Sequence, residues 1–360
     1  SVPEGWLIAA AGNPPEYNKS VREFDIVTLD RVRRMDIEAD LDVWMEYAWK
    51  KEIHGSILAY LGMKKDHFYS VENTVDGKFF VTARGWEDLS EILKAYEELG
   101  VEITENLIGE YLCRDEIARS FFASYQLYRK YGEDYGLKRL LSGEMAEEEQ
   151  QKKVKMAEGA SFEERFLVTG LLLSGLNGSF LDYEKLDKET GAVYQELLHL
   201  KAFLHDKKDM TALDEFTDVK KKSLAVRLEA ELLNLEQQTT EEFVIRTLEE
   251  FSLTIRKEHI TDTETGFERI RQLFTEMVEK RKDCAKKISR ELERAFAFMK
   301  ACFGDGQETV LFVTGLTRNS HAAAFIREYG CDPYFACSEK LLYRKQEKKL
   351  QEECESLLKI

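Results

Sequence analysis

Proline is almost absent from this chain of 360 residues. Only four prolines occur, and none lies in the range 16–332, so most of the chain lacks the residue that breaks helices most strongly. We therefore predict a mostly helical protein. The hydrophobic fraction of 43% is enough to bury a sizeable core, and the length suits two or three domains rather than one.

Long apolar runs are missing as well. No segment reaches the roughly 18 to 20 apolar residues that span a bilayer. The most apolar stretch, Phe166 to Leu176, is short and contains Thr and Gly. The opening Ser-Val-Pro-Glu-Gly-Trp has neither the basic start nor the apolar stretch of a signal peptide. We therefore expect a cytoplasmic protein that does not enter the membrane.

The six cysteines are scattered through the chain and never form a Cys-x-x-Cys pair. This pattern argues against both a disulfide framework and a zinc knuckle, and it fits reduced thiols. His321, Cys331 and Cys337 lie near one another in the sequence, but their spacing matches no ordinary zinc pattern. We therefore predict no metal site.

Basic residues are outnumbered by acidic ones, 52 against 68, which gives a formal net charge of -16. Such a chain repels the phosphates of nucleic acids, whose recognition normally needs a clustered Lys/Arg surface. The same repulsion acts at anionic membrane surfaces. We expect neither nucleic acid nor membrane as a partner, and we interpret the run Lys220-Lys221-Lys222 as a solvated helix face.

The first 40 residues differ from the rest. Trp6 to Ala11 is a short apolar run that ends at Gly-Asn-Pro-Pro, which is typical of a buried strand entering a loop. A second strand is predicted over Arg34 to Glu38. We therefore predict a small α/β portion in residues 1–40.

Residues 41–135 are predicted to be helical apart from one hairpin. The apolar spacing over Leu41 to Ile53 indicates a helix, with Asp40 as its N-cap. Phe68 to Val81 alternates around Asp76-Gly77, a dipeptide favoured in tight hairpin turns, so we predict a small β-hairpin there. Trp86 to Leu99 then returns to helix, and Gly100 is placed to end it.

Residues 142–160 are rich in Glu, Gln, Lys, Gly and Ala. This composition predicts an exposed linker or a helical spacer, which we place at residues 136–160. Beyond it, residues 161–360 are predicted to form a long helical C-terminal domain that packs as an antiparallel bundle or hairpin. Val310 to Val313 suits either strand or buried helix, and its surroundings favour helix. The predicted helices are Phe162–Leu176, Thr190–His205, Ala212–Glu236, Thr240–Glu258 and Gly266–Cys302.

Asn13 is the first candidate site residue. It follows a predicted buried strand, and the carboxyl end of a strand is where an open α/β sheet places groups that contact ligands. Its amide would orient a water molecule or a phosphate oxygen. The alternative is that Asn13 only caps a turn before two prolines.

Three segments together resemble the AAA+ ATPases, in particular the MoxR-like branch. They are the strand that ends in Gly-Asn-Pro, the later Leu-Asp-Arg at Leu29 to Arg31, and the segment Thr-Ala-Arg-Gly-Trp-Glu-Asp-Leu-Ser that begins at Thr82. The resemblance runs from Val2 to Tyr131, about a third of the chain. It implies a partial ATPase core with few strands in 1–40 and a helical lid in 41–135.

The resemblance also implies roles for three side chains. Asn13 looks like the residue that positions the attacking water or the γ-phosphate. Arg31 resembles the arginine finger that one subunit supplies to its neighbour's site, where it stabilises the charge on the transferred phosphoryl group. Arg84 resembles the lid arginine that contacts the γ-phosphate. Arginine suits both places because its planar fork meets phosphate oxygens in a bidentate way.

Each arginine has an alternative interpretation. Arg31 stands in a run of basic residues and could be a surface charge or pair with Asp30. Val32 follows it, whereas the family usually has an aromatic residue there, so Arg33 or Arg34 is an alternative finger. Arg84 could pair with Glu87 or Asp88 across the first turn of its helix, and the family more often has Ser-Pro-Arg than Thr-Ala-Arg.

No Gly-x-x-x-x-Gly-Lys-Ser/Thr loop occurs in the chain, and no apolar strand ending in paired acids stands ahead of Asn13 to hold Mg²⁺. Because the sequence starts only a few residues before the first predicted strand, we expect a fragment of a chaperone-like remodelling ATPase that is inactive alone. ATP and Mg²⁺ are implied for the intact protein, and neither is expected to bind tightly to this piece.

The resemblance further implies a homo-oligomeric ring, with neighbouring subunits as partners, and a partner protein that contains a von Willebrand factor A domain. The alternative function is a non-catalytic helical scaffold or protein-interaction module. The two differ in whether a phosphate-binding loop and an acidic Mg²⁺ strand are encoded ahead of Val2.

Overall fold

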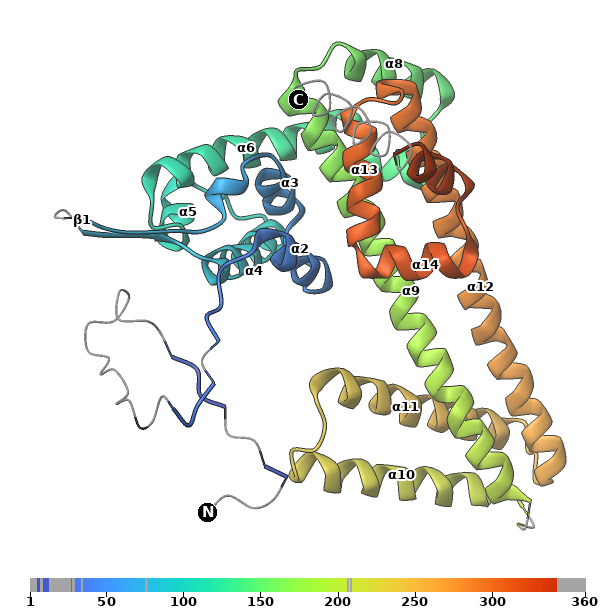
Figure 1. Ribbon diagram of the computed structural model, residues 1–360. Helices are drawn as coiled ribbons and strands as arrows, with labels where there is room; N and C mark the ends of the chain where they lie inside the picture. Colours follow the sequence, from blue (N-terminus) through green and yellow to red (C-terminus); the bar gives the residue numbers. More distant parts are fainter. Residues whose placement is uncertain are drawn as a thin grey trace, which may run out of the picture. The chain divides into compact units, whose positions relative to one another are not determined.

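The fold is mostly helical, with one small two-stranded antiparallel sheet, in the computed structural model drawn in Figure 1. The structure describes residues 5–6, 9–12, 27, 30–33, 35–74, 77–205, 207 and 209–341. The chain divides into two units, Ser1–Asp40 and Leu41–Ile360. Among the described residues, no helix is both long and apolar enough to cross a bilayer.

The two strands predicted in the first unit are corrected by the structure. Trp6 and residues 9–12 are exposed and belong to no strand, and the same holds for residues 35–38; Leu7, Ile8 and Arg34 lie outside the described residues. A short apolar run is a weak strand signal, because a strand also needs a neighbour that satisfies its backbone N–H and C=O groups.

The second unit begins with short helices and the hairpin. Its elements up to residue 158 are α2 (Leu41–Lys50), α3 (Gly55–Met63), β1 (Ser70–Thr74), β2 (Gly77–Val81), α4 (Ala83–Leu99), α5 (Glu105–Tyr111), α6 (Asp115–Tyr135), α7 (Leu137–Ser142) and α8 (Glu147–Glu158). The predicted hairpin is therefore confirmed. Its register pairs Thr74 with Gly77, so Gly77 belongs to β2 and not to the centre of the turn.

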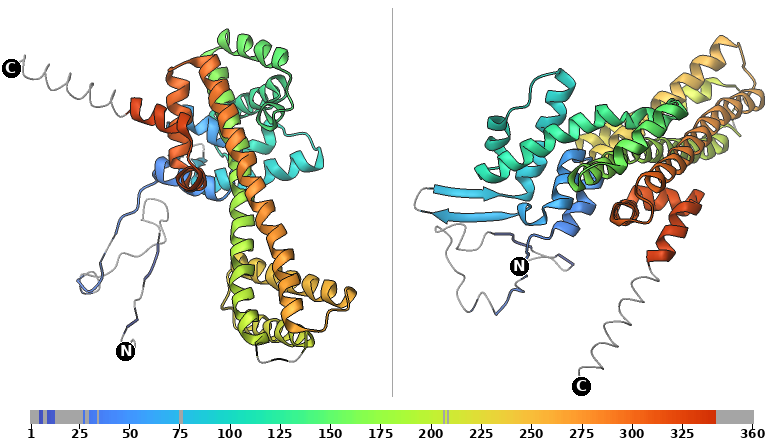
Figure 2. Two further views of the ribbon diagram at one scale, coloured as in Figure 1. Left: turned by 90° about the vertical axis from the view of Figure 1, so that its right-hand side faces the viewer. Right: turned by 90° about the horizontal axis from the view of Figure 1, so that it is seen from above.

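The long helices follow. They are α9 (Phe162–Leu204), α10 (Thr211–Glu229), α11 (Leu235–Lys257) and α12 (Thr263–Phe303), and then α13 (Gln307–Arg318) and α14 (Ser320–Tyr329). Figure 2 shows α9 and α12 side by side and running in opposite directions, with α10 and α11 packed at one end of the pair. The prediction of helix at Val310 to Val313 is confirmed by α13.

The helix α9 corrects the prediction of two helices over 162–176 and 190–205. Polar residues interrupt the apolar pattern between them, but no proline breaks the backbone, and Phe180 and Tyr183 within the gap are buried. Packing against α12 and α14 therefore continues the helix where its apolar periodicity alone is weak.

Two hydrophobic cores stabilise the second unit. The first draws residues from helices α2 to α9 and α12 to α14, including Leu137, Leu140 and Leu141 of α7. The segment predicted as a linker or spacer thus contributes buried side chains to the same core as its neighbours on both sides. The second core joins the C-terminal half of α9 to α10, α11 and the start of α12, and it contains Val193, Leu200, Leu213, Leu248 and Ile270.

Candidate functional site

Arg84 is the predicted site residue that the structure describes best. It lies in the first turn of α4 and is exposed. The Thr82 side chain caps this helix by accepting a hydrogen bond from the Gly85 backbone N–H, and Gly100, at φ 67°, ends it in the left-handed region as predicted. The backbone that carries Arg84 is therefore fixed at both ends of the helix.

Trp86 sets the direction in which Arg84 points. Its side chain is fully buried, and its ring N–H donates a hydrogen bond of 3.1 Å to the Phe68 carbonyl. The centroid of its ring lies 5.3 Å from the ring centroid of Phe121 and 5.9 Å from that of Tyr60. Residues two apart on a helix point about 200° away from each other, so the buried Trp86 directs Arg84 to the solvent side.

The carboxylates beside Arg84 do not neutralise it. Within the described part of the chain Arg84 forms no ion pair with Glu87 or Asp88. Glu87 instead accepts a hydrogen bond of 2.6 Å from the Tyr47 hydroxyl of α2, and this bond raises the pKa of Tyr47 to about 12. The guanidinium is thus exposed and available to an anion.

The other two predicted residues belong to the first unit. Arg31 is exposed in a turn, and no ion pair joins it to Asp30 or to any other described residue. Asn13 lies outside the described residues, as does Arg34, one of the alternative fingers. The structure therefore places Arg31 and Arg84 individually, each exposed, and the predicted convergence with Asn13 stays a prediction.

His54 belongs to a polar network that the sequence does not indicate. Its Nδ1 lies 2.7 Å from the Ser56 hydroxyl and its Nε2 3.2 Å from Glu97, which also accepts a hydrogen bond of 2.8 Å from Tyr125. Burial raises the pKa of Glu97, but hydrogen bonds and charge from His54 outweigh it, so the pKa lies below its usual range. Hydroxyl, imidazole and carboxylate are ordered as in hydrolases, yet Ser56 is 1% exposed and unreachable for a substrate.

His67 lies just ahead of the hairpin in the chain, and its ring centroid is 5.7 Å from that of Tyr60. Its Nδ1 is 2.6 Å from the Tyr60 hydroxyl, and burial raises the pKa of Tyr60 to about 12. Burial also lowers the pKa of His67 below its ordinary value. Neutral imidazole is therefore the form that the fold accommodates.

This arrangement predicts a loss of stability at mildly acidic pH. The unfolded imidazole binds a proton near pH 6.5, whereas the folded one resists it, so the contribution of His67 is complete above about pH 6.5 and is lost as the pH falls through the folded-state pKa. In urea titrations from pH 8 to 5.5, His67→Gln should flatten the pH dependence of the free energy of unfolding. His199→Gln, at an exposed histidine, is the matched control and should show the same pH dependence of the free energy of unfolding as the wild type. Equal slopes in His67→Gln and the wild type would contradict the assignment.

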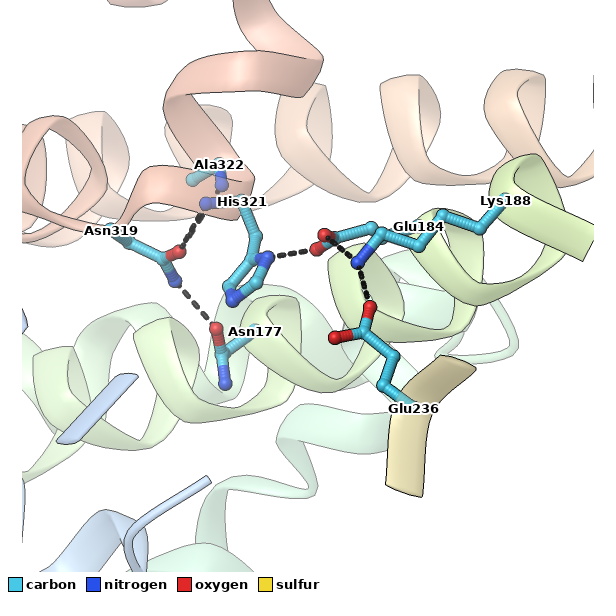
Figure 3. A network of polar contacts seen from close by, with 7 residues as sticks. All are labelled: Asn177, Glu184, Lys188, Glu236, Asn319, His321 and Ala322. Carbon is cyan, nitrogen blue, oxygen red and sulfur yellow. Dashed lines mark hydrogen bonds and ion pairs between the residues drawn. The ribbon is translucent and has the colours of Figure 1, made fainter. Parts of the chain in front are cut away.

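A second polar network joins α14 to α9 (Figure 3). Asn319 caps α14 by accepting hydrogen bonds from the backbone N–H groups of His321 and Ala322, and its amide donates to Asn177 at 2.6 Å. The His321 Nδ1 pairs with Glu184, and its buried Nε2 has no partner among the described residues. Buried amides that satisfy one another fix the position of one helix on another.

The same network extends toward α11. Lys188 bridges Glu184 at 2.8 Å and Glu236 at 2.5 Å, and these two hydrogen bonds raise the pKa of the Lys188 ammonium. Burial raises the pKa of Glu184, but bonds from Lys188 and the His321 ring outweigh it and lower the pKa overall. Among the described residues no group of three or more His, Cys, Asp or Glu side chains is arranged to hold a metal ion.

No protein-family model matches this chain, and no curated protein or solved structure matches it either. The candidate site therefore rests on the geometry around Arg84 and on the motifs of the sequence.

Proposed function

We propose that this chain is part of a cytoplasmic AAA+ remodelling ATPase of the MoxR-like kind, in which it supplies the lid and the second half of the motor core. The observation that supports the proposal most is the placement of Arg84. Its guanidinium is exposed, has no ion pair with a described residue, and stands on a helix turn anchored by the buried Trp86.

The proposed chemistry follows from that placement. A guanidinium offers a rigid fork of N–H donors that meets two phosphate oxygens at once, and it stays charged at any physiological pH. At the first turn of α4 the positive end of the helix dipole adds to its attraction for an anion. Arg84 would therefore contact the γ-phosphate of ATP, and the angle of the lid would follow the state of the nucleotide.

The remaining parts of the site are proposed from the sequence resemblance. Asn13 would position the attacking water, and Arg31 would reach the site of the neighbouring subunit in a homo-oligomeric ring. ATP and Mg²⁺ need a phosphate-binding loop that these 360 residues do not contain. A protein with a von Willebrand factor A domain is the proposed partner, and the helices after Phe162 are the proposed partner-specific region.

The packing supports a mechanical role for the lid. The helices α3 and α6 of the predicted lid pack directly on the N-terminal half of α9, within one hydrophobic core. Interiors of this density transmit small displacements instead of absorbing them. A change in lid angle would therefore move α9, and with it the α10–α11 hairpin at its other end.

The test begins with the coding sequence ahead of Ser1, where the proposal expects a phosphate-binding loop and an acidic Mg²⁺ strand. In the protein expressed from that start, Arg84→Ala should lower ATP turnover by roughly a hundredfold, the usual cost of removing one donor to transition-state charge. The ATP turnover of Arg84→Lys should lie between those of the wild type and Arg84→Ala, because an ammonium keeps the charge but loses the bidentate contact.

Arg119→Ala is the matched control for this experiment. Arg119 is an exposed arginine of α6 that pairs with two surface acids, Glu105 at 3.4 Å and Asp115 at 4.0 Å. Its removal should leave turnover unchanged. Either an upstream sequence without the loop or full turnover in Arg84→Ala would overturn the proposal, and so would nucleotide-specific ATP hydrolysis by the purified 360-residue chain.

A non-catalytic scaffold is the second candidate, and the α10–α11 hairpin favours it. This hairpin and the ends of α9 and α12 have a hydrophobic core of their own. Large apolar side chains remain exposed along α10 and at the turn into α11, namely Val219, Val226, Leu232 and Leu235. Exposed apolar groups of this kind often mark a protein-binding surface. Absence of the loop from the upstream sequence would favour this function.

A further inference from the structure

The pair of long helices α9 and α12 is interrupted between the two hydrophobic cores. Neither core includes a residue of 184–191 in α9 or of 278–283 in α12, and the structure describes all of these residues. We call these two stretches the joint. The arm is residues 192–277, which contain the second core, and the body is the rest of the second unit, which contains the first core.

Packing at the joint is loose. Of its residues, all described, only Thr190 is buried, and the Thr190 hydroxyl has no hydrogen-bond partner among the described residues. An open groove of about 400 Å³ runs between the two helices here. Gly191 beside it is exposed, and a Cβ atom added there would meet nothing within 4 Å. Glycine weakens a helix interior, so we expect α9 to open more easily here than next to either core.

A chain of ion pairs crosses the joint in place of apolar contacts (Figure 3). Lys188 bridges Glu236 of α11, at 2.5 Å, and Glu184 of α9. Glu184 in turn pairs with His321 of α14. Because α11 belongs to the arm and α14 to the body, these charges link the two parts.

Arg281 of α12 forms a second link. Its guanidinium donates to Asp187 of α9 and, at 3.0 Å, to Glu328 of α14. The acceptor side chains of Asp187 and Glu328 are 43% and 49% exposed. Partly exposed ion pairs add little to stability, and salt screens them. The contacts across the joint are therefore individually weak and easily exchanged for contacts with water.

We propose that the joint is a hinge, and that the two links form a latch that holds the arm in one orientation on the body. Helices bend where the hydrogen-bond ladder or the packing is weakened, and a few residues at such a point absorb the change in backbone angles. Each core moves as one piece, since close-packed interiors deform little. With the latch open, the arm turns independently of the body. This hinge does not require ATP hydrolysis.

Single-molecule FRET on the 360-residue chain without nucleotide tests the hinge. Fluorophores attached through unnatural amino acids at Leu99 of α4 and Val226 of α10, both exposed, report the distance between body and arm. The wild type should show one distance at low salt and further, displaced states in about 1 M NaCl, where the screening length is about 3 Å. Arg281→Gln and Lys188→Gln should each raise the population of displaced states about two- to fivefold, the value of one ion pair.

Lys282→Gln is the matched control. Lys282 lies in the same stretch of α12, but it pairs with Glu279 of the same helix, at 2.7 Å, and does not cross the joint through that contact. This variant should show the distances of the wild type. A second fluorophore pair, at Val226 and the exposed Glu264, lies within the arm. Its distance should stay constant under all conditions, which separates a turn of the arm from unfolding of the arm.

Hydrogen exchange followed by mass spectrometry gives an independent measurement on the wild type. Amides of 184–191 and 278–283 should exchange roughly tenfold faster or more than those of 172–180, which lie on α9 next to the first core. Three results would each overturn the proposal: a body-to-arm distance that neither salt nor the two variants change, equal displacement in Lys282→Gln, or joint amides that exchange as slowly as those of 172–180.

Discussion

Replacing Arg31 with alanine is expected to reduce ATP turnover of the proposed ring by roughly a thousandfold or more. A fixed guanidinium from the neighbouring subunit stabilises the charge that builds on the transferred phosphoryl group, and this contribution amounts to about 10³ to 10⁵ in rate in enzymes of this chemistry. Arg31 is exposed and has no ion pair with a described residue, which leaves it free to reach a second subunit.

The distinctive feature of this prediction is rescue in trans. Mixing the Arg31→Ala subunit with a subunit that has an intact Arg31 but an inactive phosphate-binding loop should restore turnover, because the finger of one subunit completes the site of the other. Loss of turnover in Arg84→Ala should not be restored in this way. Arg33→Ala and Arg34→Ala are the matched controls, and a larger loss in either of them would transfer the role of finger from Arg31.

Removing the Trp86 side chain is expected to cost about 3 to 5 kcal/mol of unfolding free energy, the usual range for a large aromatic residue truncated to alanine in a core. Trp86 is fully buried, donates to the Phe68 carbonyl, and contacts both Tyr60 and Phe121. Trp86→Ala would leave a cavity and an unpaired carbonyl at the base of the hairpin. Urea denaturation followed by circular dichroism measures the loss.

Trp86→Phe separates the two causes of that loss. It keeps a ring in the core and removes the indole N–H, so it should cost about 1 to 2 kcal/mol. The exposed Val219→Ala should change stability by less than about 0.5 kcal/mol. If Trp86→Ala were as stable as the wild type, Trp86 would not be the anchor of the first turn of α4, and the direction of Arg84 would need another cause.

The local features of the fold follow from the sequence. Gly100 ends α4 because only a residue without a Cβ adopts its positive φ without strain, and that property is visible in the sequence. The absence of proline over 16–332 likewise predicts the long helices. The hairpin at Phe68 to Val81 follows from its alternation, although the register in the structure places Gly77 in the strand.

The features that depend on distant contacts do not follow from the sequence. Asn177 and Asn319 are 142 residues apart, and nothing local pairs them. His321 and Glu184, which are 137 residues apart, are a similar case. The sequence also does not predict that α9 is a single helix, because the tertiary packing of Phe180 and Tyr183 stabilises the helix across a polar stretch.

For Arg84, the sequence and the structure contribute different information. The sequence places Arg84 in the first turn of a helix, and the structure adds its exposure, the buried anchor Trp86 and the absence of an ion pair among the described residues. The approach of Asn13 and Arg31 to the same phosphate depends on contacts between units and between subunits. Such contacts form only in the assembled ring, so the local sequence around each residue does not predict them.

The most direct measurement is a structure of the assembled ring with a non-hydrolysable ATP analogue. The account predicts that the Asn13 amide and the Arg84 guanidinium of one subunit, with Arg31 of the next, lie at about 3 Å from oxygens of the γ-phosphate or its attacking water. A ring in which Asn13 and Arg84 face unrelated surfaces, with no nucleotide between them, would contradict it.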